Sequence, residues 1–256
     1  VSKRTSNPRG VFWMTNYVFD VDGTLTRSRG RINEGFRRFF LKFIQDHKVY
    51  LVTGSDYHKT VEQVSREVTE SVEKVFNCSG NSVWRKGLNI QKTDWSIPME
   101  VRGWLKKKLN ESKFDLRTGN HIEERPGLVN FSTIGRGCNL EQRRLYVKFD
   151  SIHGEREKIT KEFNDKFPNI TAQVAGETGI DIIPAGKDKR QVAFMIDGPI
   201  TFFGDKMKYG GNDYPLKFAI EGRADSGAIE VKDWEQTHRY LQQIQIFSLQ
   251  EAVGMV

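Results

Sequence analysis

The sequence predicts an α/β protein: a doubly wound core built on a parallel sheet, interrupted by an inserted α+β domain. Near the start of the chain, short apolar runs alternate with segments of helical apolar spacing, and this alternation returns near the end. Such alternation is typical of parallel strands joined by right-handed crossovers. The middle of the chain lacks it. We therefore assign residues 1–83 and 186–256 to the core and residues 84–185 to the inserted domain.

The composition narrows the range of functions. The chain has 256 residues, enough for one or two domains, and a formal net charge of +7. A positive excess favours phosphate ligands, but no basic block is interleaved with aromatic residues, so we expect no nucleic-acid partner. No apolar run reaches membrane-spanning length, so we expect no membrane partner. The two cysteines, Cys78 and Cys138, indicate no disulfide framework and favour a cytoplasmic location.

The first half of the core is predicted from four elements in order. Residues 1–15 are polar and basic, so we expect a disordered arm there, unless translation begins at Met14. A buried strand follows at 17–19. Asn33 can cap a helix, and apolar residues then follow at helical spacing: Phe36, Phe39, Phe40, Phe43 and Ile44. A second strand at 48–52 precedes a helix capped by Asp56, whose apolar line is Val61, Val64, Val68, Val72 and Val75. A third strand is predicted at 75–77.

The inserted domain mixes helices and strands without regular alternation. Pro98 fits the first turn of a helix that runs through Val101, Leu105 and Leu109. Residues 128–134 alternate in the manner of a strand. Residues 155–167 carry apolar side chains at near-helical spacing, and 179–183 form another apolar run. The core pattern then returns, with a short helical run after residue 187, a strand at 200–203 and a final helix at 233–247.

Two aspartates directly after the first strand are the leading candidates for chemistry. Asp20 and Asp22 lie two residues apart, so in an extended segment their side chains share a face. Close carboxylates repel unless a cation relieves them, and oxygen ligands of this kind suit Mg²⁺. The plainer alternative is an acidic turn after a strand.

Other polar residues are predicted to join these aspartates. The carboxyl ends of parallel strands form the ligand-binding edge of a sheet, which places Thr53 and Ser55 there. Their hydroxyl and N–H groups could bind a phosphate oxygen, unless they only cap the following helix. Asp205 ends a later strand and converges on the same edge. Lys189 could neutralise a transferring phosphoryl group, although the KDKR run at 187–190 could equally be a solvated surface segment.

The run FDVDGTLT at 19–26, followed in order by Thr53, Lys189 and Asp205, resembles the motifs of the haloacid dehalogenase superfamily of phosphotransferases. The resemblance implies a haloacid dehalogenase-like core with the inserted domain as a cap. It implies that Asp20 is the nucleophile that becomes an aspartyl phosphate and that Asp22 is the general acid and base. It also implies that Asp20, the backbone carbonyl of Asp22 and Asp205 hold Mg²⁺, with Asp213 as an outer-sphere ligand.

Further segments resemble the eukaryotic-type phosphomannomutases: GSD at 54–56, IGRGC at 134–138, FFGDK at 202–206 and GGND at 210–213. This resemblance spans residues 16–237. It implies that three cap arginines bind the distant phosphate of the sugar: Arg125, Arg136 and Arg143. Arginine suits phosphate because its guanidinium is a planar, permanently charged fork. The resemblance also places Arg27 near the substrate and Asp181 in the sugar site, with Gly179 where the family has serine. Lys217 and Ala219 stand in the family's second metal loop.

The function implied is that of a phosphomannomutase, which interconverts mannose 6-phosphate and mannose 1-phosphate, on the route to GDP-mannose. The resemblance further implies a hexose phosphate as the small-molecule partner and a hexose 1,6-bisphosphate as activator, and it leaves open a homodimer formed through the cap. One alternative is a Mg²⁺-dependent sugar-phosphate phosphatase that uses the same chemistry, with water as the acceptor. Another is a non-catalytic phospho-ligand binding protein, against which the intact Asp20, Asp22, Lys189 and Asp205 argue.

Overall fold

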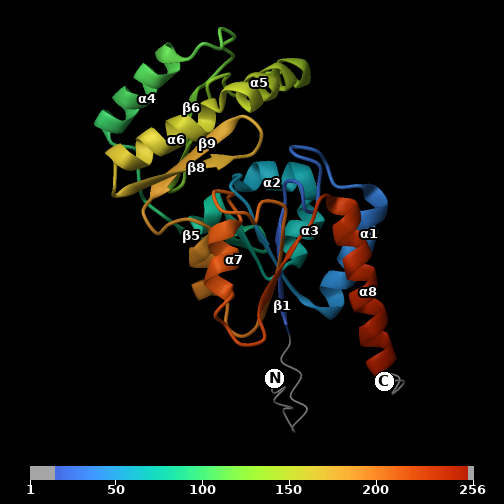
Figure 1. The fold of residues 1–256 in the computed structure, drawn as a ribbon. Helices are drawn as coiled ribbons and strands as arrows, with labels where there is room; N and C mark the ends of the chain where they lie inside the picture. Colours follow the sequence, from blue (N-terminus) through green and yellow to red (C-terminus); the bar gives the residue numbers. More distant parts are fainter. Residues whose placement is uncertain (1–14, 253–256) are drawn as a thin grey trace, which may run out of the picture.

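The core is a seven-stranded sheet with helices on both faces, and a smaller four-stranded sheet with its own helices lies above one edge of it (Figure 1). The computed structural model describes residues 15–252, and side chains to residue 246. The predicted arm lies outside the described residues, apart from residue 15. The order of strands in the core sheet is β11-β10-β1-β2-β3-β4-β5. Their bounds are β1 Asn16–Asp20, β2 Lys48–Val52, β3 Lys74–Asn77, β4 Ser82–Arg85, β5 Leu88–Lys92, β10 Ile200–Gly204 and β11 Gly227–Glu230.

The central strands are buried on both faces. β1 pairs in parallel with β2 and with β10. Successive side chains of a strand point to opposite faces, so Val18 and Phe19 belong to two different apolar clusters. The first cluster packs under α1 and α8, and the second under α7 and a 3₁₀ helix, η2. The predicted doubly wound α/β core is therefore confirmed. The bounds of the core helices are α1 Glu34–Asp46, α2 Tyr57–Val64, α3 Arg66–Ser71, α7 Tyr214–Ile220, α8 Trp234–Ala252, η1 Cys78–Gly80 and η2 Lys189–Met195.

Local signals account for the first helices. The Asn33 side chain accepts hydrogen bonds from the N–H groups of Gly35 and Phe36, as an N-cap does. Asp56 caps α2 in the same way. The predicted second helix is divided in two at Ser65, which has a φ of +81° and caps α3 through its own hydroxyl. Val61, Val64 and Val68 pack into the same cluster on either side of this break, which is why the periodicity predicted one helix. The prediction was wrong at its end, because Val72 lies just past the last residue of α3 and Val75 belongs to β3.

The cap is an antiparallel sheet in the order β6-β7-β9-β8, covered by helices. Its strands are β6 Ile122–Arg125, β7 Leu128–Phe131, β8 Ile170–Ala175 and β9 Gly179–Pro184, and its helices are α4 Met99–Glu111, α5 Leu140–His153 and α6 Glu155–Lys166. Helices α4 and α6 bury Leu105 and Phe163 against Phe131 of the sheet. Helix α5 was not predicted from the sequence. Its buried side chains include Arg143 and Asp150, so it lacks the apolar periodicity that predicts a helix. Across residues 15–252, no helix combines the length and apolar character needed to cross a membrane.

The predicted division between core and cap falls inside a core strand. β4 begins at Ser82 and pairs antiparallel with β3, and β5 pairs with β4 in turn. This hairpin extends the core sheet before the chain enters α4 at Met99. Antiparallel strands joined by a short turn give no strand–helix alternation, and for that reason the sequence pattern assigned them to the insertion.

Candidate active site

Asp20 is the last residue of β1, at the edge of the core sheet that faces the cap (Figure 1). Its side chain is almost fully buried. Gly23, three residues on, turns the chain with a φ of +86°, and a Cβ there would lie 2.3 Å from Asp205 Oδ2. Only glycine permits both the left-handed backbone and this close approach. The turn thus brings the loop after β1 directly against the end of β10.

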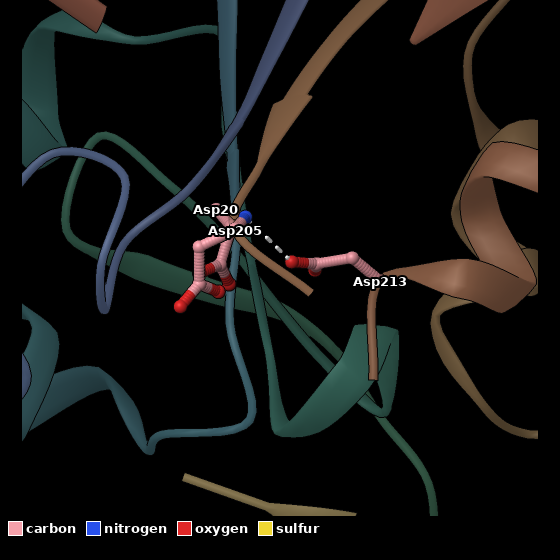
Figure 2. A group of neighbouring side chains, drawn as sticks. All are labelled: Asp20, Asp205 and Asp213. Atoms are coloured by element: carbon pink, nitrogen blue, oxygen red, sulfur yellow. Dashed lines mark hydrogen bonds between the residues drawn. The ribbon is translucent and has the colours of Figure 1, made fainter. Parts of the chain in front are cut away.

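Three carboxylates converge behind this turn. Asp20, Asp205 and Asp213 each offer an oxygen, and these oxygens all lie within 4.8 Å of one another (Figure 2). The buried Lys189 ammonium donates to Asp20 Oδ1 at 2.5 Å and to Asp213 Oδ1 at 2.6 Å. The other oxygen of Asp213 accepts the backbone N–H groups of Asp205 and Lys206, both at 3.1 Å. Asp213 therefore fixes Lys189 on one side and the strand end on the other.

The charges in this cluster do not balance. Burial, reinforced by the nearby carboxylates of Asp213 and Asp205, raises the pKa of Asp20 well above its ordinary value, although Lys189 opposes the shift. Burial also raises the pKa of Asp205 to about 6, with Asp213 contributing. Three carboxylates face one ammonium, and a divalent cation with a preference for oxygen ligands fits such a donor set.

Asp22 is held differently from Asp20. Its Oδ1 accepts the backbone N–H of Arg29 at 2.6 Å and the side-chain amide of Gln63 at 2.9 Å. Both bonds use the same oxygen. The carboxylate is therefore fixed in orientation through Oδ1, and Asp22 lines the pocket between core and cap. A carboxylate held in this way can exchange a proton with a bound hydroxyl.

A pocket of about 600 Å³, including its open mouth, lies between these core residues and the cap. Three cap arginines line it: Arg125, Arg136 and Arg143. Arg143 pairs with Glu177 at 3.0 Å, and Arg136 pairs with Glu123 at 3.0 Å. Within residues 15–246, neither Arg125 Nε nor Arg143 Nη2 has a hydrogen-bond partner, although both atoms are buried. Buried donors of this kind normally have a partner, and a ligand oxygen in the pocket would reach these two only after the guanidinium groups shift.

The sugar-binding candidate Asp181 belongs to a small polar network. Asn130 donates to Asp181 Oδ1 at 2.7 Å, and Arg136 donates to Asn130 Oδ1 at 3.2 Å. A Cβ on Gly179 would lie 2.6 Å from Asn130 Nδ2. Glycine at 179, where the resembling family has serine, therefore makes room for the Asn130 amide. Burial raises the pKa of Asp181, against the influence of Arg125.

The structure brings most of the predicted site residues into one place. The pocket is lined by Asp20, Asp22, Thr53, Ser55, Arg125, Arg136, Arg143, Asp181 and Asp205. Lys189 and Asp213 lie behind Asp20. Arg27 does not line this pocket; it is exposed and lies at a neighbouring cleft. Arg29, two residues further along, lines the pocket instead.

Sequence reasoning missed several lining residues, among them Arg29, Lys59, Asn130 and Glu177. Lys59 could have been found, because it stands in the first turn of the helix capped by Asp56, at the predicted ligand edge. Burial, together with Arg29 and Arg136, lowers the pKa of Lys59 to about 8. Its ammonium has no carboxylate partner within the described residues.

The fold is that of the haloacid dehalogenase-like proteins, with an inserted cap. A haloacid dehalogenase-like hydrolase from Bacteroides thetaiotaomicron superposes with a TM-score of 0.56 at 14% identity, over 90% of this chain and 99% of that one. The C-terminal domain of the trehalose-6-phosphate phosphatase of C. albicans gives a TM-score of 0.61 at 13% identity, over 90% and 92% of the two chains. At these identities the likeness concerns the fold.

Sequence comparison narrows the class. The model of the family described as eukaryotic phosphomannomutase matches residues 36–245. A probable phosphomannomutase of Caenorhabditis elegans is 34% identical over 81% of this chain and 87% of its own. The phosphomannomutase of Saccharomyces cerevisiae is 32% identical over 79% and 84% of the two chains. The chain belongs to the eukaryotic phosphomannomutase family, and the resemblance inferred from its motifs is confirmed.

Proposed function

We propose that this protein is a phosphomannomutase, which interconverts mannose 6-phosphate and mannose 1-phosphate through an aspartyl phosphate on Asp20. The observation that carries the proposal is that cationic side chains lie on both the core side and the cap side of one site. Lys189 beside Asp20 would form one phosphate-binding end, and the cap arginines would form the other. A phosphatase needs only the first end, so the second favours a mutase.

The first half-reaction charges the enzyme. Asp20 attacks one phosphorus of a hexose 1,6-bisphosphate, the bond from phosphorus to the sugar oxygen breaks, and Asp22 gives its proton to the leaving oxygen. Lys189 stabilises the negative charge on the transferred group. Asp20, Asp205 and the backbone carbonyl of Asp22 would hold Mg²⁺, with Asp213 as an outer-sphere ligand. When bound, Mg²⁺ neutralises charge on the phosphoryl oxygens.

The second half-reaction uses the pocket in both directions. Mannose 6-phosphate binds with its phosphate at Arg125, Arg136 and Arg143. Asp22 removes the proton from the 1-hydroxyl, whose oxygen attacks the aspartyl phosphorus and frees Asp20. The resulting mannose 1,6-bisphosphate turns round and returns its 6-phosphate to Asp20, which leaves mannose 1-phosphate. Asp181 and Asn130, which line the same pocket, would hold sugar hydroxyls.

The proposal is tested with mannose 6-phosphate, supplied with and without a catalytic amount of hexose 1,6-bisphosphate. We expect mannose 1-phosphate to form only when the bisphosphate is present, with little free phosphate. Release of free phosphate as the main product, with or without the bisphosphate, would instead support the phosphatase alternative.

A further inference from the structure

A second cleft opens beside the active-site pocket. It measures about 1400 Å³, including its open mouth, and lies between the core loop 27–30 and helix α5 of the cap. Ser28, Arg29, Arg143 and Glu177 line both spaces. Because the two spaces share these residues, the second cleft lies directly beside the active-site pocket.

This cleft carries a strong positive charge. Besides the shared Arg29 and Arg143, it is lined by Arg27, Arg144 and Lys148. None of these last three cations has a carboxylate within ion-pair distance in the part of the chain that the structure describes. Glu177, the one acidic residue among the lining residues, is paired with Arg143. Five cations and one carboxylate thus line the cleft, which leaves four positive charges in excess.

Helix α5 contributes part of the positive charge that lines the cleft. Arg144, Lys148 and Ser151 follow at spacings of four and three residues, so they share one face of the helix. The helix is anchored at its start by a capping box between Asn139 and Gln142. Arg143, which is buried, ties the same helix to the active-site pocket. The cationic face is therefore held in place by the fold.

We propose that this cleft is a second anion-binding site, which holds the hexose bisphosphate intermediate while it turns round between the two half-reactions. The proposal rests on the mutase function proposed above. A bisphosphate carries about twice the negative charge of either monophosphate, since each phosphate bears a charge of roughly −1.5 to −2. A strongly cationic cleft therefore retains the intermediate and lets the monophosphate product leave.

Retention of the intermediate has a chemical consequence for the enzyme. A bisphosphate that escapes leaves Asp20 without its phosphoryl group, and the enzyme then waits for another donor. A bisphosphate held beside the pocket returns and transfers its second phosphate to Asp20. The cleft would thus keep the enzyme charged over many turnovers.

The test compares two triple variants that lose the same charge. The first is Arg27→Gln, Arg144→Gln, Lys148→Gln, at residues that line the cleft and not the active-site pocket. The control is Lys42→Gln, Lys106→Gln, Lys161→Gln, at exposed residues that line neither space. Each enzyme, with Asp20 carrying a radiolabelled phosphoryl group, is mixed with excess mannose 6-phosphate, and the protein is removed by rapid filtration during the first turnovers. The label that passes the filter as bisphosphate and as mannose 1-phosphate is then counted.

We expect the cleft variant to release at least three times as much free bisphosphate per turnover as the wild type, and to need correspondingly more added bisphosphate for sustained activity. The control should match the wild type. The double variant Arg27→Lys, Arg144→Lys keeps all three positive charges, so it should retain the bisphosphate as well as the wild type does. Equal release by the cleft variant and the control would overturn the proposal. Failure of the wild type to isomerise mannose 6-phosphate at all would overturn the mutase function first, so the two failures are distinguishable.

Discussion

Lys189 and Asp20 lie 169 positions apart in the chain, yet the Lys189 ammonium nitrogen is 2.5 Å from Asp20 Oδ1. Asp20 ends the first strand, and Lys189 begins the helix that follows the cap. Both side chains are almost completely buried. The pair therefore joins two core segments that the cap separates in the sequence, and the reaction centre is complete only when both segments are in place.

Asp20→Asn should abolish turnover while the fold persists. An amide nitrogen or neutral amide oxygen cannot form the aspartyl phosphate, whereas the similar shape preserves packing. Radiolabelled phosphate on the protein after incubation with acetyl phosphate measures the intermediate, and circular dichroism checks the fold. Near wild-type turnover by a folded Asp20→Asn protein would show that Asp20 is not the nucleophile.

Removal of Mg²⁺ should stop isomerisation. Asp20, Asp205 and Asp213 then leave a bound phosphate facing uncompensated negative charge. A second readout needs no substrate: millimolar Mg²⁺ should raise the melting temperature of the wild type by mass action, and Asp205→Asn should reduce that shift. Full activity in excess chelator would contradict the prediction.

Arg136→Ala should weaken hexose-phosphate conversion but leave Asp20 able to accept a phosphoryl group from acetyl phosphate. Loss of one desolvated, charge-assisted contact should cost on the order of 2–5 kcal/mol. Arg85, which is exposed on β4 and lines neither cavity, provides the control as Arg85→Ala. Isomerisation and aspartyl-phosphate formation are measured side by side. If Arg136→Ala behaves like the control in both assays, Arg136 does not bind the distant phosphate.

Lys59→Gln should stabilise the free protein and weaken sugar-phosphate binding. Burial, Arg29 and Arg136 lower the pKa of Lys59 to about 8. Between pH 8 and the ordinary pKa of lysine, the folded state binds fewer protons than the unfolded state, so the free energy of unfolding rises with pH in that range. Below pH 8, Lys59 is charged in both states, and the full cost of burying its charge remains. We expect the variant to gain about 1–2 kcal/mol in the free energy of unfolding at pH 7.

That gain should shrink as the pH approaches 10, where Lys59 is already neutral in the folded wild type. Urea unfolding at pH 7 and at pH 9.5 measures both values, and Lys42→Gln, on an exposed part of α1, should show neither effect. A variant that is less stable than the wild type at pH 7 would show that the Lys59 ammonium has a partner that stabilises the folded protein.

Gly179→Ser should destabilise this protein although the resembling family carries serine there. The new Cβ would meet the Asn130 amide, which must move and give up its hydrogen bond to Asp181. We expect a loss of about 1–3 kcal/mol in the free energy of unfolding. Gly103→Ala, in α4 with open space around it, should be neutral or slightly stabilising. Equal stability of Gly179→Ser and the wild type would mean that the Asn130 side chain can adopt another conformation at no cost in free energy.

The sequence predicted those parts of the molecule whose signals are local. Asn33 and Asp56 predict the starts of the helices that they cap. The apolar runs before Asp20 and Asp205 predict the strands that end beside these two residues. The β4–β5 hairpin could not be assigned to the core, because its partner strand is chosen by tertiary packing. Arg29 was missed in favour of Arg27 for a similar reason. Both lie in a loop without periodicity, and the hydrogen bond from the Arg29 backbone to Asp22 decides which side chain faces the pocket.

A hydrogen bond joins the cap to the core at the site itself. Arg125 Nη1 donates to the backbone oxygen of Gly54 at 2.8 Å. Arg125 Nε takes no part in this bond and has no hydrogen-bond partner within residues 15–246, so binding of a phosphate by Arg125 need not break it. Any movement of the cap away from the core would break it, so Arg125 links the position of the cap to the distant-phosphate site proposed above.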